Sequence, residues 1–368
     1  MPREARTPAE AKGKVPVTAR QVKFVQALNE ALDLCMAKDP RVFVLGLGTP
    51  DAAAVFGSTK GLVDKYGPRR VLDMPVSENA MTGVAIGTAL RGMRPVMTHM
   101  RLEFAMLTID QIVNQAAKWH YMFGGQASVP LVIRMVVGRG WGQGPQHSQS
   151  LHAWFAHVPG LKVVMPATPY DAKGLLVSAI EDDNPVVFIE HRWLYNIHGP
   201  VPEGIYRVPL GRANVLRRGR HVTVAASSYM TLETVRAADE LAGEGLELEI
   251  VDIRTLNPFD ETPVVESVRK TGRLIVADTG CRSVGFAAEV VTRVVEQCLG
   301  DLKEPPVRIT LPDLPTPTTR ALSNYYYPLV RDITAAARRL VGRPPKPEPA
   351  IKPDDFLDAP DPTFTGPF

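Results

Sequence analysis

Residues 73–95, DMPVSENAMTGVAIGTALRGMRP, decide the fold, because they hold a strand end, a helix and the turn back into the next strand. The helix is lined with glycine and alanine, and Gly83 and Gly87 lie four residues apart on one side. Small residues at this spacing allow another helix to approach closely. The stretch therefore predicts a helix packed tightly between a sheet and a neighbour.

A single acid, Glu78, stands where the strand gives way to this helix. An acid in the first turn is often only a favourable partner of the helix dipole. A carboxylate buried at a close helix or subunit contact would instead have a protonation state set by its surroundings. Position alone leaves both interpretations open.

Helical and strand-like segments alternate on both sides of this stretch. RVFVLGLG (41–48), PVMTHM (95–100) and VPLVIRMVV (129–137) are continuous apolar runs, and residues 104–123 have helical periodicity. Buried strands alternating with helices are typical of a parallel sheet covered on both faces. A second alternating set follows from His221 onward. The sequence therefore predicts an α/β fold with two doubly wound domains, the second smaller than the first.

Changes in composition divide the chain. We expect a flexible N-terminal arm over 1–19, a first domain over 20–200, a linker with a short hairpin over 201–220, a second domain over 221–342 and a proline-rich tail over 343–368. The tail is too rich in proline and charge to build a core, so its removal is expected to leave folding intact. Its aromatic residues leave open whether part of it docks on a surface.

Composition excludes several classes of protein. A chain of 368 residues with a net charge of +3 and interspersed basic residues does not favour nucleic acid as the main partner. The three cysteines are far apart and match no metal or redox spacing. The charged N-terminus and the lack of a membrane-length apolar run predict a cytoplasmic protein without a membrane partner.

The loop 138–149, GRGWGQGPQHSQ, follows a predicted strand. Its glycines match neither a dinucleotide-binding nor a P-loop pattern. Loops at the carboxyl ends of parallel strands form the ligand crevice of such sheets. His147 is therefore placed either to meet a ligand or only to bond nearby backbone.

Longer stretches carry a resemblance to a known family. Residues 73–96, 109–126, 146–191 and 249–276 resemble the β subunit of the decarboxylating component of 2-oxoacid dehydrogenases, which includes the pyruvate and branched-chain enzymes. This family belongs to the transketolase-like thiamine diphosphate superfamily. The resemblance extends over residues 20–342, and it implies a pyrimidine-binding domain followed by a transketolase C-terminal-like domain.

The resemblance also implies roles for particular residues. Glu78 in PVSE matches the glutamate that hydrogen-bonds N1′ of the cofactor's aminopyrimidine and so promotes deprotonation of the thiazolium carbon. Met100 and Phe104 match the pyrimidine pocket, and His147 matches the histidine of the active-site channel. Glu78 and His147 are thus the expected catalytic residues. In the family, backbone carbonyls hold a structural potassium ion, and the matching residues are Leu131, Ala179, Ile180, Asp182 and Asn184.

No G-D-G motif, which holds the diphosphate through Mg²⁺ in this superfamily, occurs in the chain. A separate α subunit is therefore expected to supply Mg²⁺ and the diphosphate contacts, in an α2β2 heterotetramer. The resemblance further implies docking to a lipoyl acyltransferase core. Two charged residues, Arg101 and Glu103 in RLEF, stand where the family usually has TFNF.

The leading hypothesis is a β subunit that decarboxylates a pyruvate-like 2-oxoacid and passes the acyl group to a lipoyl acceptor. One alternative is a carboligase that transfers the activated group to a carbonyl compound such as a keto-sugar, without a lipoyl partner. Another is a catalytically silent structural subunit.

Overall fold

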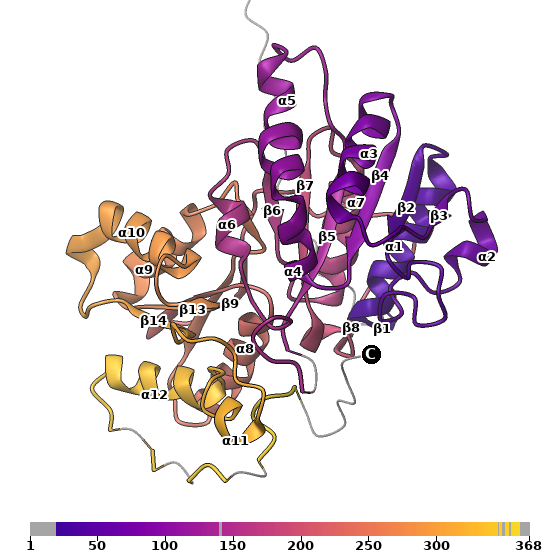
Figure 1. The fold of residues 1–368 in the computed structure, drawn as a ribbon. Coiled ribbons are helices and arrows are strands. Elements are labelled where there is room, and N and C mark those ends of the chain that lie inside the picture. Colours follow the sequence, from indigo (N-terminus) through magenta and orange to yellow (C-terminus); the bar gives the residue numbers. More distant parts are fainter. Residues whose placement is uncertain (1–19, 140–141, 345, 348–349, 353–354, 361–368) are drawn as a thin grey trace, which may run out of the picture.

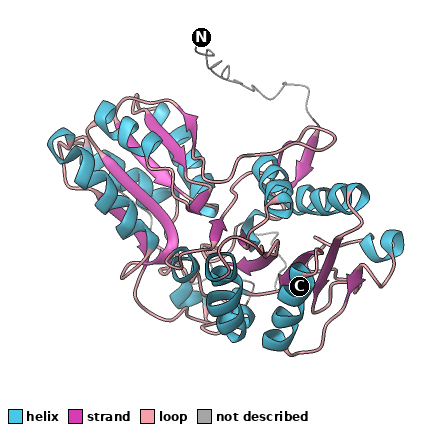
Figure 2. Ribbon diagram, turned by 90° about the horizontal axis from the view of Figure 1, so that it is seen from above, coloured by secondary structure: helices cyan, strands magenta, loops and turns pink. Residues whose placement is uncertain are grey.

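The computed structural model describes residues 20–139, 142–344, 346–347, 350–352 and 355–360 (Figure 1). The arm expected over 1–19 lies outside these residues. Among the described residues, two large sheets have helices on both sides of their strands, and a third sheet has only two short strands (Figure 2). The sequence-based fold class, two doubly wound α/β domains, is confirmed.

The larger sheet has seven strands in the order β12-β6-β7-β5-β4-β2-β3. Its strands are β2 (Val42–Gly46), β3 (Val71–Leu72), β4 (Arg94–His99), β5 (Val132–Val137), β6 (Lys162–Val164), β7 (Val186–His191) and β12 (Thr255–Asn257). All pairs are parallel except that of β12 with β6. Every residue of β2, β5 and β7 is buried, as their continuous apolar runs predict.

Each face of this sheet has its own hydrophobic core. Val96 of β4 packs in a cluster with residues of α1 (Phe24–Lys38) and α7 (Pro169–Glu181). Its neighbour Met97 points to the other face, into a cluster with residues of α3 (Glu78–Leu90). The period of two along a strand accounts for this division.

The segment that follows β4 is helical without a break from residue 102 to 122, as its periodicity predicts, but its hydrogen-bonding pattern changes along its length. It contains α4 (Leu102–Ala105), a 3-10 turn η1 (Met106–Thr108), a π-helical segment η2 (Gln111–Ala116) and α5 (Ala117–Met122). The glycines expected to end it do so, since Gly124 and Gly125 both have positive φ. The 3-10 and π-helical parts lie where the segment packs against α3.

The smaller sheet has five strands in the order β14-β13-β10-β11-β9, with only β9 antiparallel (Figure 1, orange to yellow). Its strands are β9 (Asn214–Arg217), β10 (Val222–Ala226), β11 (Leu248–Asp252), β13 (Leu274–Cys281) and β14 (Val307–Leu311). One face packs against α8 (Tyr229–Ala242) and α12 (Val330–Leu340), and the other against α9 (Thr262–Thr271) and α10 (Phe286–Cys298). The remaining elements are β1 (Gln21–Lys23), α2 (Leu62–Tyr66), α6 (His152–Ala156), η3 (Arg192–Leu194), β8 (His198–Pro200), η4 (Leu299–Asp301) and α11 (Arg320–Ser323).

The connection between the domains differs from the expected hairpin, which was wrong. β8 pairs with β1 and β9 pairs with β11, so the two strands of this region join different sheets. Conversely, β12 belongs to the second half of the chain but pairs with β6, and it thereby extends the first sheet. Edge strands offer unpaired backbone groups, and these pairings satisfy them.

The described residues of the tail lie along the chain's own surface. Asp358 is buried with 5% of its area exposed, and Ala359 packs at the edge of a core cluster. Polar contacts hold this segment against the rest of the chain, although it contains few apolar residues. No helix among the described residues is long and apolar enough to cross a membrane.

Candidate active site

The residues expected to act together follow neighbouring parallel strands. Glu78 follows β3, Met100 and Phe104 follow β4, and His147 follows β5. The strand order β5-β4-β2-β3 brings the carboxyl ends of these strands to one edge of the sheet. The chain steps from β2 outward to β3 and then returns to β4 on the other side of β2. This reversal is a topological switch point, where open α/β sheets bind ligands.

Glu78 is the first residue of α3 and is 5% exposed. Its carboxylate makes no hydrogen bond or ion pair with any residue that the structure describes. Thr82 Oγ1 donates instead to the backbone oxygen of Glu78 at 2.8 Å. The positive end of the helix dipole favours an anion here. The carboxylate therefore does not cap the helix through a hydrogen bond, and it remains available to a ligand.

The backbone after β2 closes one side of this crevice. The Gly48 N–H donates to Asp73 Oδ1 at 2.9 Å, which ties the ends of β2 and β3 together. A Cβ atom on Gly48, whose φ is +68°, would come within 2.9 Å of Met100 Cε. The thioether of Met100 thus lies against bare backbone and forms an apolar wall.

His147 and Phe104 are in direct contact. Their rings meet edge to face, with 5.4 Å between centroids and 66° between planes. His147 Nδ1 lies 2.6 Å from the Gln146 carbonyl oxygen. If Nδ1 carries the proton in that bond, Nε2 is the unprotonated nitrogen and can accept one from a ligand. The backbone bond is therefore compatible with contact to a ligand through Nε2, and this role of His147 stays a prediction.

The charged residues of RLEF hold the loop that carries His147. Arg101 is 3% exposed and donates through Nη1 to the Gly138 carbonyl, and its guanidinium lies over the Phe56 ring. Burial lowers the pKa of Arg101 to about 10. Glu103 Oε1 accepts from the Gln149 N–H at 2.6 Å. Burial also raises the pKa of the Glu103 carboxyl. The two side chains thus fix the start and the end of the loop.

Sequence reasoning identified these two charges but not their role. The sequence does contain a signal for such a role, namely two charged residues within an apolar segment. The partners, Gly138 and Gln149, lie on a loop distant in sequence, and only the pairing of β4 with β5 brings them close.

Four of the five carbonyls expected to hold potassium accept hydrogen bonds within the chain. Arg94 Nη1 donates to Ile180 O at 3.1 Å and to Asp182 O at 3.0 Å. Leu131 O accepts from the Val186 N–H, and Ala179 O accepts from the Asp182 N–H. At Asn184, the backbone N–H bonds Asp182 Oδ1. A guanidinium at these oxygens does not fit a potassium ion beside it, so the site stays a prediction and no step of the proposed function depends on it.

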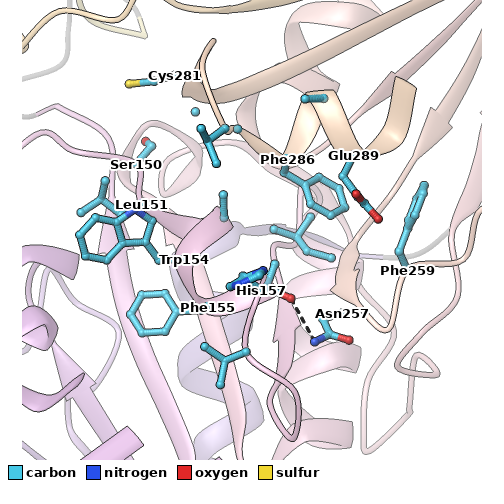
Figure 3. A pocket seen from close by; sticks show the side chains of 18 of the residues that line it. Ser150, Leu151, Trp154, Phe155, His157, Asn257, Phe259, Cys281, Phe286 and Glu289 are labelled. Carbon is cyan, nitrogen blue, oxygen red and sulfur yellow. Dashed lines mark hydrogen bonds between the residues drawn. The ribbon is translucent and has the colours of Figure 1, made fainter. Parts of the chain in front are cut away.

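A large cavity in the described part of the chain lies elsewhere. It has a volume of about 780 Å³ and lies between α6 and the β13–α10 connection (Figure 3). Trp154, Phe155 and Phe286 line it, and Asn257 Nδ2 donates across its edge to Ala156 O at 3.2 Å. Neither Glu78 nor His147 lines it. The candidate active site is thus separate from this cavity.

Comparisons with known proteins identify the family to which both domains belong. The model of the transketolase pyrimidine-binding domain matches residues 20–197, and that of the transketolase C-terminal domain matches residues 211–333. The β subunit of acetoin:2,6-dichlorophenolindophenol oxidoreductase of Cupriavidus necator is 46% identical over 331 residues, covering 87% of this chain and 98% of that protein. The mitochondrial pyruvate dehydrogenase E1 component subunit β-2 of Oryza sativa is 42% identical over 335 residues, covering 90% and 89%.

A solved structure has the same architecture. It is described as a split gene transketolase in an inactive β4 tetramer, and it superposes with a TM-score of 0.69 at 25% identity. The match covers 87% of this chain and 98% of that chain. The likeness therefore extends over both domains.

Proposed function

Because this chain belongs to the family of β subunits that form the decarboxylating component of thiamine diphosphate-dependent 2-oxoacid dehydrogenases, we propose that it supplies the pyrimidine half of a cofactor site shared with an α subunit. The observation that carries this proposal is Glu78. Its carboxylate is buried at a helix N-terminus, at the switch point of the sheet, and has no partner among the described residues.

The residues around Glu78 fit an aminopyrimidine ring. Met100 and Phe104 offer apolar and aromatic surface, and Glu78 offers one carboxyl group able to bond a ring nitrogen. When bound, thiamine diphosphate supplies a nucleophilic carbon and an electron sink for loss of carbon dioxide. Glu78 would hold or release a proton at its carboxyl oxygens. His147 would exchange a proton with the substrate at Nε2.

A partner subunit is needed for the rest of the site. The chain contains no G-D-G motif, so we propose that an α subunit holds Mg²⁺ and the diphosphate in an α2β2 heterotetramer. The outer face of α3, next to Glu78, supports this assembly. On this helix, Val84 is 53% exposed and a Cβ on Gly87 would meet nothing within 4 Å, and Val76, two residues before the helix begins, is 74% exposed. Apolar and small residues on such a face are suited to burial by another chain.

We propose pyruvate or a similar 2-oxoacid as substrate and a lipoyl group as acceptor. Acetoin is a second candidate, because relatives from Cupriavidus necator and Bacillus subtilis are named for it. Glu103 Oε1 accepts from the N–H of Gln149, two residues from His147, so its charge would affect an anionic substrate at this histidine more than a neutral one. A cytoplasmic location stays a prediction.

The test is turnover by the chain reconstituted with the α chain that co-purifies with it. Pyruvate and acetoin are each supplied with thiamine diphosphate and Mg²⁺, with either a lipoyl domain or 2,6-dichlorophenolindophenol as acceptor. Reduction of the lipoyl domain with pyruvate supports the leading proposal. Carbon dioxide release with transfer only to an added aldehyde or keto-sugar would favour the carboligase. Absence of turnover with every acceptor would leave the structural-subunit alternative.

A further inference from the structure

The described part of the C-terminal tail places a carboxylate between two arginines. Asp358 Oδ2 lies 3.2 Å from Arg139 Nη1, and Asp358 Oδ1 lies 3.2 Å from Arg320 Nε. Ser323 Oγ also donates to Asp358 Oδ2 at 2.7 Å. The side chains of Asp358 and Arg139 are each 3% exposed. This is a buried charge cluster built from three distant parts of the chain.

Other contacts fix the tail as it approaches this cluster. The Asn324 amide donates to the Asp355 carbonyl at 2.7 Å, and its oxygen accepts from the Leu357 N–H at 3.1 Å. The Arg320 guanidinium lies 3.8 Å from the centre of the Phe356 ring. The position of Asp358 is therefore set by several neighbours and not by its ion pairs alone.

Arg139 connects this cluster to the active-site loop. It follows Gly138 at the end of β5, and it donates to the carbonyls of Pro317 at 3.2 Å and Thr318 at 2.7 Å. The Trp193 indole donates in turn to the Arg139 carbonyl at 2.6 Å. A buried guanidinium that loses its carboxylate partner is strongly destabilised. Asp358 thus stabilises Arg139 in the place where it joins the loop to residues 317–318.

The same segment touches the loop close to His147. A Cβ atom on Gly144 would lie 2.2 Å from Thr318 Oγ1, so the Thr318 side chain packs directly against the backbone of the loop there. The His147 N–H then bonds the Gly144 carbonyl at 3.3 Å. Residues 317–318 therefore support the loop both at its first residues, through Arg139, and just before the histidine.

We propose that Asp358 is a positioning residue, and that the C-terminal tail is an intramolecular clasp that holds the His147 loop in its working position. The inference rests on the proposed function for the role of His147, but the clasp itself is defined by contacts within this chain. Arg101 and Glu103 fix the loop from the first domain, and the tail fixes it from the second.

The test uses the full-length chain assembled with its α chain. Asp358→Asn removes the charge and keeps the shape, and Asp358→Glu restores the charge. Asp301→Asn, in an exposed pair with Arg269, is the matched control for loss of one surface charge. A chain ending at residue 349, with and without a peptide of residues 350–360 added in trans, tests the clasp without a substitution.

Hydrogen exchange at residues 142–149 is the first measurement. We expect exchange there to accelerate roughly tenfold or more in Asp358→Asn and in the shortened chain, because local opening becomes easier. Asp358→Glu and the added peptide should restore protection, and Asp301→Asn should match wild type. Unchanged exchange in both Asp358→Asn and the shortened chain would overturn the clasp.

Steady-state kinetics is the second measurement. Loss of positioning should lower kcat/KM for the substrate by ~10–100-fold, while the Kd of thiamine diphosphate changes less than about twofold, since its expected contacts lie on α3 and after β4. An equal loss in cofactor affinity would indicate general unfolding and contradict a positioning role. If the wild-type complex has no turnover at all, the proposed function fails, and hydrogen exchange still decides whether the clasp exists.

Discussion

Glu78 combines burial, a helix N-terminus and an unused carboxylate, and this determines what its substitution should change. Glu78→Gln keeps the volume and can still accept a hydrogen bond, but an amide cannot move a proton. Loss of a positioned proton-transfer group typically costs ~10²–10⁴-fold, so kcat should fall within about this range. Assembly should persist, and cofactor affinity should change only modestly.

The direct measurement is exchange of the thiazolium C2 proton in the complex of this chain with its α partner. Asn79→Ala, at the next and exposed position of α3, is a suitable control. If Glu78→Gln exchanges this proton as fast as wild type, Glu78 only stabilises the helix start.

Glu103 provides a test of substrate charge. Glu103→Gln keeps an oxygen for the Gln149 N–H but removes a negative charge close to His147. An interaction of ~1 kcal/mol is reasonable for charges near a protein surface, so kcat/KM for pyruvate relative to acetoin should rise about fivefold. Because burial raises the pKa of Glu103, the gain should be present above that pKa and vanish as the pH falls and the wild-type carboxyl protonates.

The measurement is the ratio of kcat/KM for the two substrates across pH, with exposed Glu247→Gln as the control. A ratio that is unchanged at all pH values would mean that the charge of Glu103 does not reach the substrate.

At the scale of elements, the order of helices and strands was largely predictable, because continuous apolar runs and glycine stops are local signals. The 3-10 and π-helical parts of the long helix after β4 were not, since they depend on packing against α3. The pairing of β12 with β6, and of β8 with β1, joins residues far apart in sequence. No local pattern specifies such partners.

The same distinction between local sequence patterns and distant partners applies to the candidate site. Glu78 and His147 lie in short motifs that the sequence exhibits directly, and strand order then brings them to one edge of the sheet. The roles of Arg101 and Asp358 depend on partners that only the folded chain brings near. The composition of the tail predicted a segment that folding does not need. Composition shows how few apolar residues the tail has, but it does not show the buried ion pairs of Asp358.

The loop after α7 provides a prediction about cations. Arg94 bonds the Ile180 and Asp182 carbonyls and the Asp183 carboxylate, so a positive charge already occupies this turn. We expect Tm to be the same in potassium and sodium chloride at equal ionic strength. Arg94→Met should lower stability by ~1–3 kcal/mol, because it leaves carbonyls without donors.

Thermal unfolding of wild type and Arg94→Met in both salts is the measurement, with exposed Arg91→Met as control. A rise in the wild-type Tm that is specific to potassium would contradict this assignment and restore the predicted ion site.

At the scale of the whole molecule, the junction of the two domains contains a buried carboxyl group. Burial, and then repulsion from Asp171, raises the pKa of Asp252 to about 8, although Arg254 opposes the shift. Thr231 Oγ1 donates to Asp252 Oδ1 at 3.2 Å, and Oδ2 has no partner among the described residues. An unfolded aspartate titrates near ~4. The stability that the protonated folded form provides is therefore present below about pH 4 and is lost as the pH rises to about 8.

Asp252→Asn removes this dependence, because the amide is neutral at every pH and its oxygen can keep the Thr231 bond. Relative to wild type, the variant should gain stability as the pH rises from 5 to 8, by an amount of the order of a few kcal/mol. Denaturant unfolding at both pH values measures the difference. A difference that is independent of pH would show that Asp252 does not titrate in this range.

The last prediction concerns how the site is completed. This chain alone offers Glu78 and the apolar surface of Met100 and Phe104, but no motif for the diphosphate. Since each tenfold in affinity is ~1.4 kcal/mol, loss of several charge-assisted diphosphate contacts should weaken thiamine diphosphate binding by at least ~100-fold relative to the α–β complex. Calorimetric titration of the chain, of the α chain and of their complex, each with Mg²⁺, measures this. Val84→Arg, on the exposed face of α3, should block assembly and tight binding without changing the Tm of the isolated chain, because Val84 is 53% exposed. Tight binding by the isolated chain, or normal assembly of Val84→Arg, would mean that the cofactor site does not lie between this face and a partner subunit.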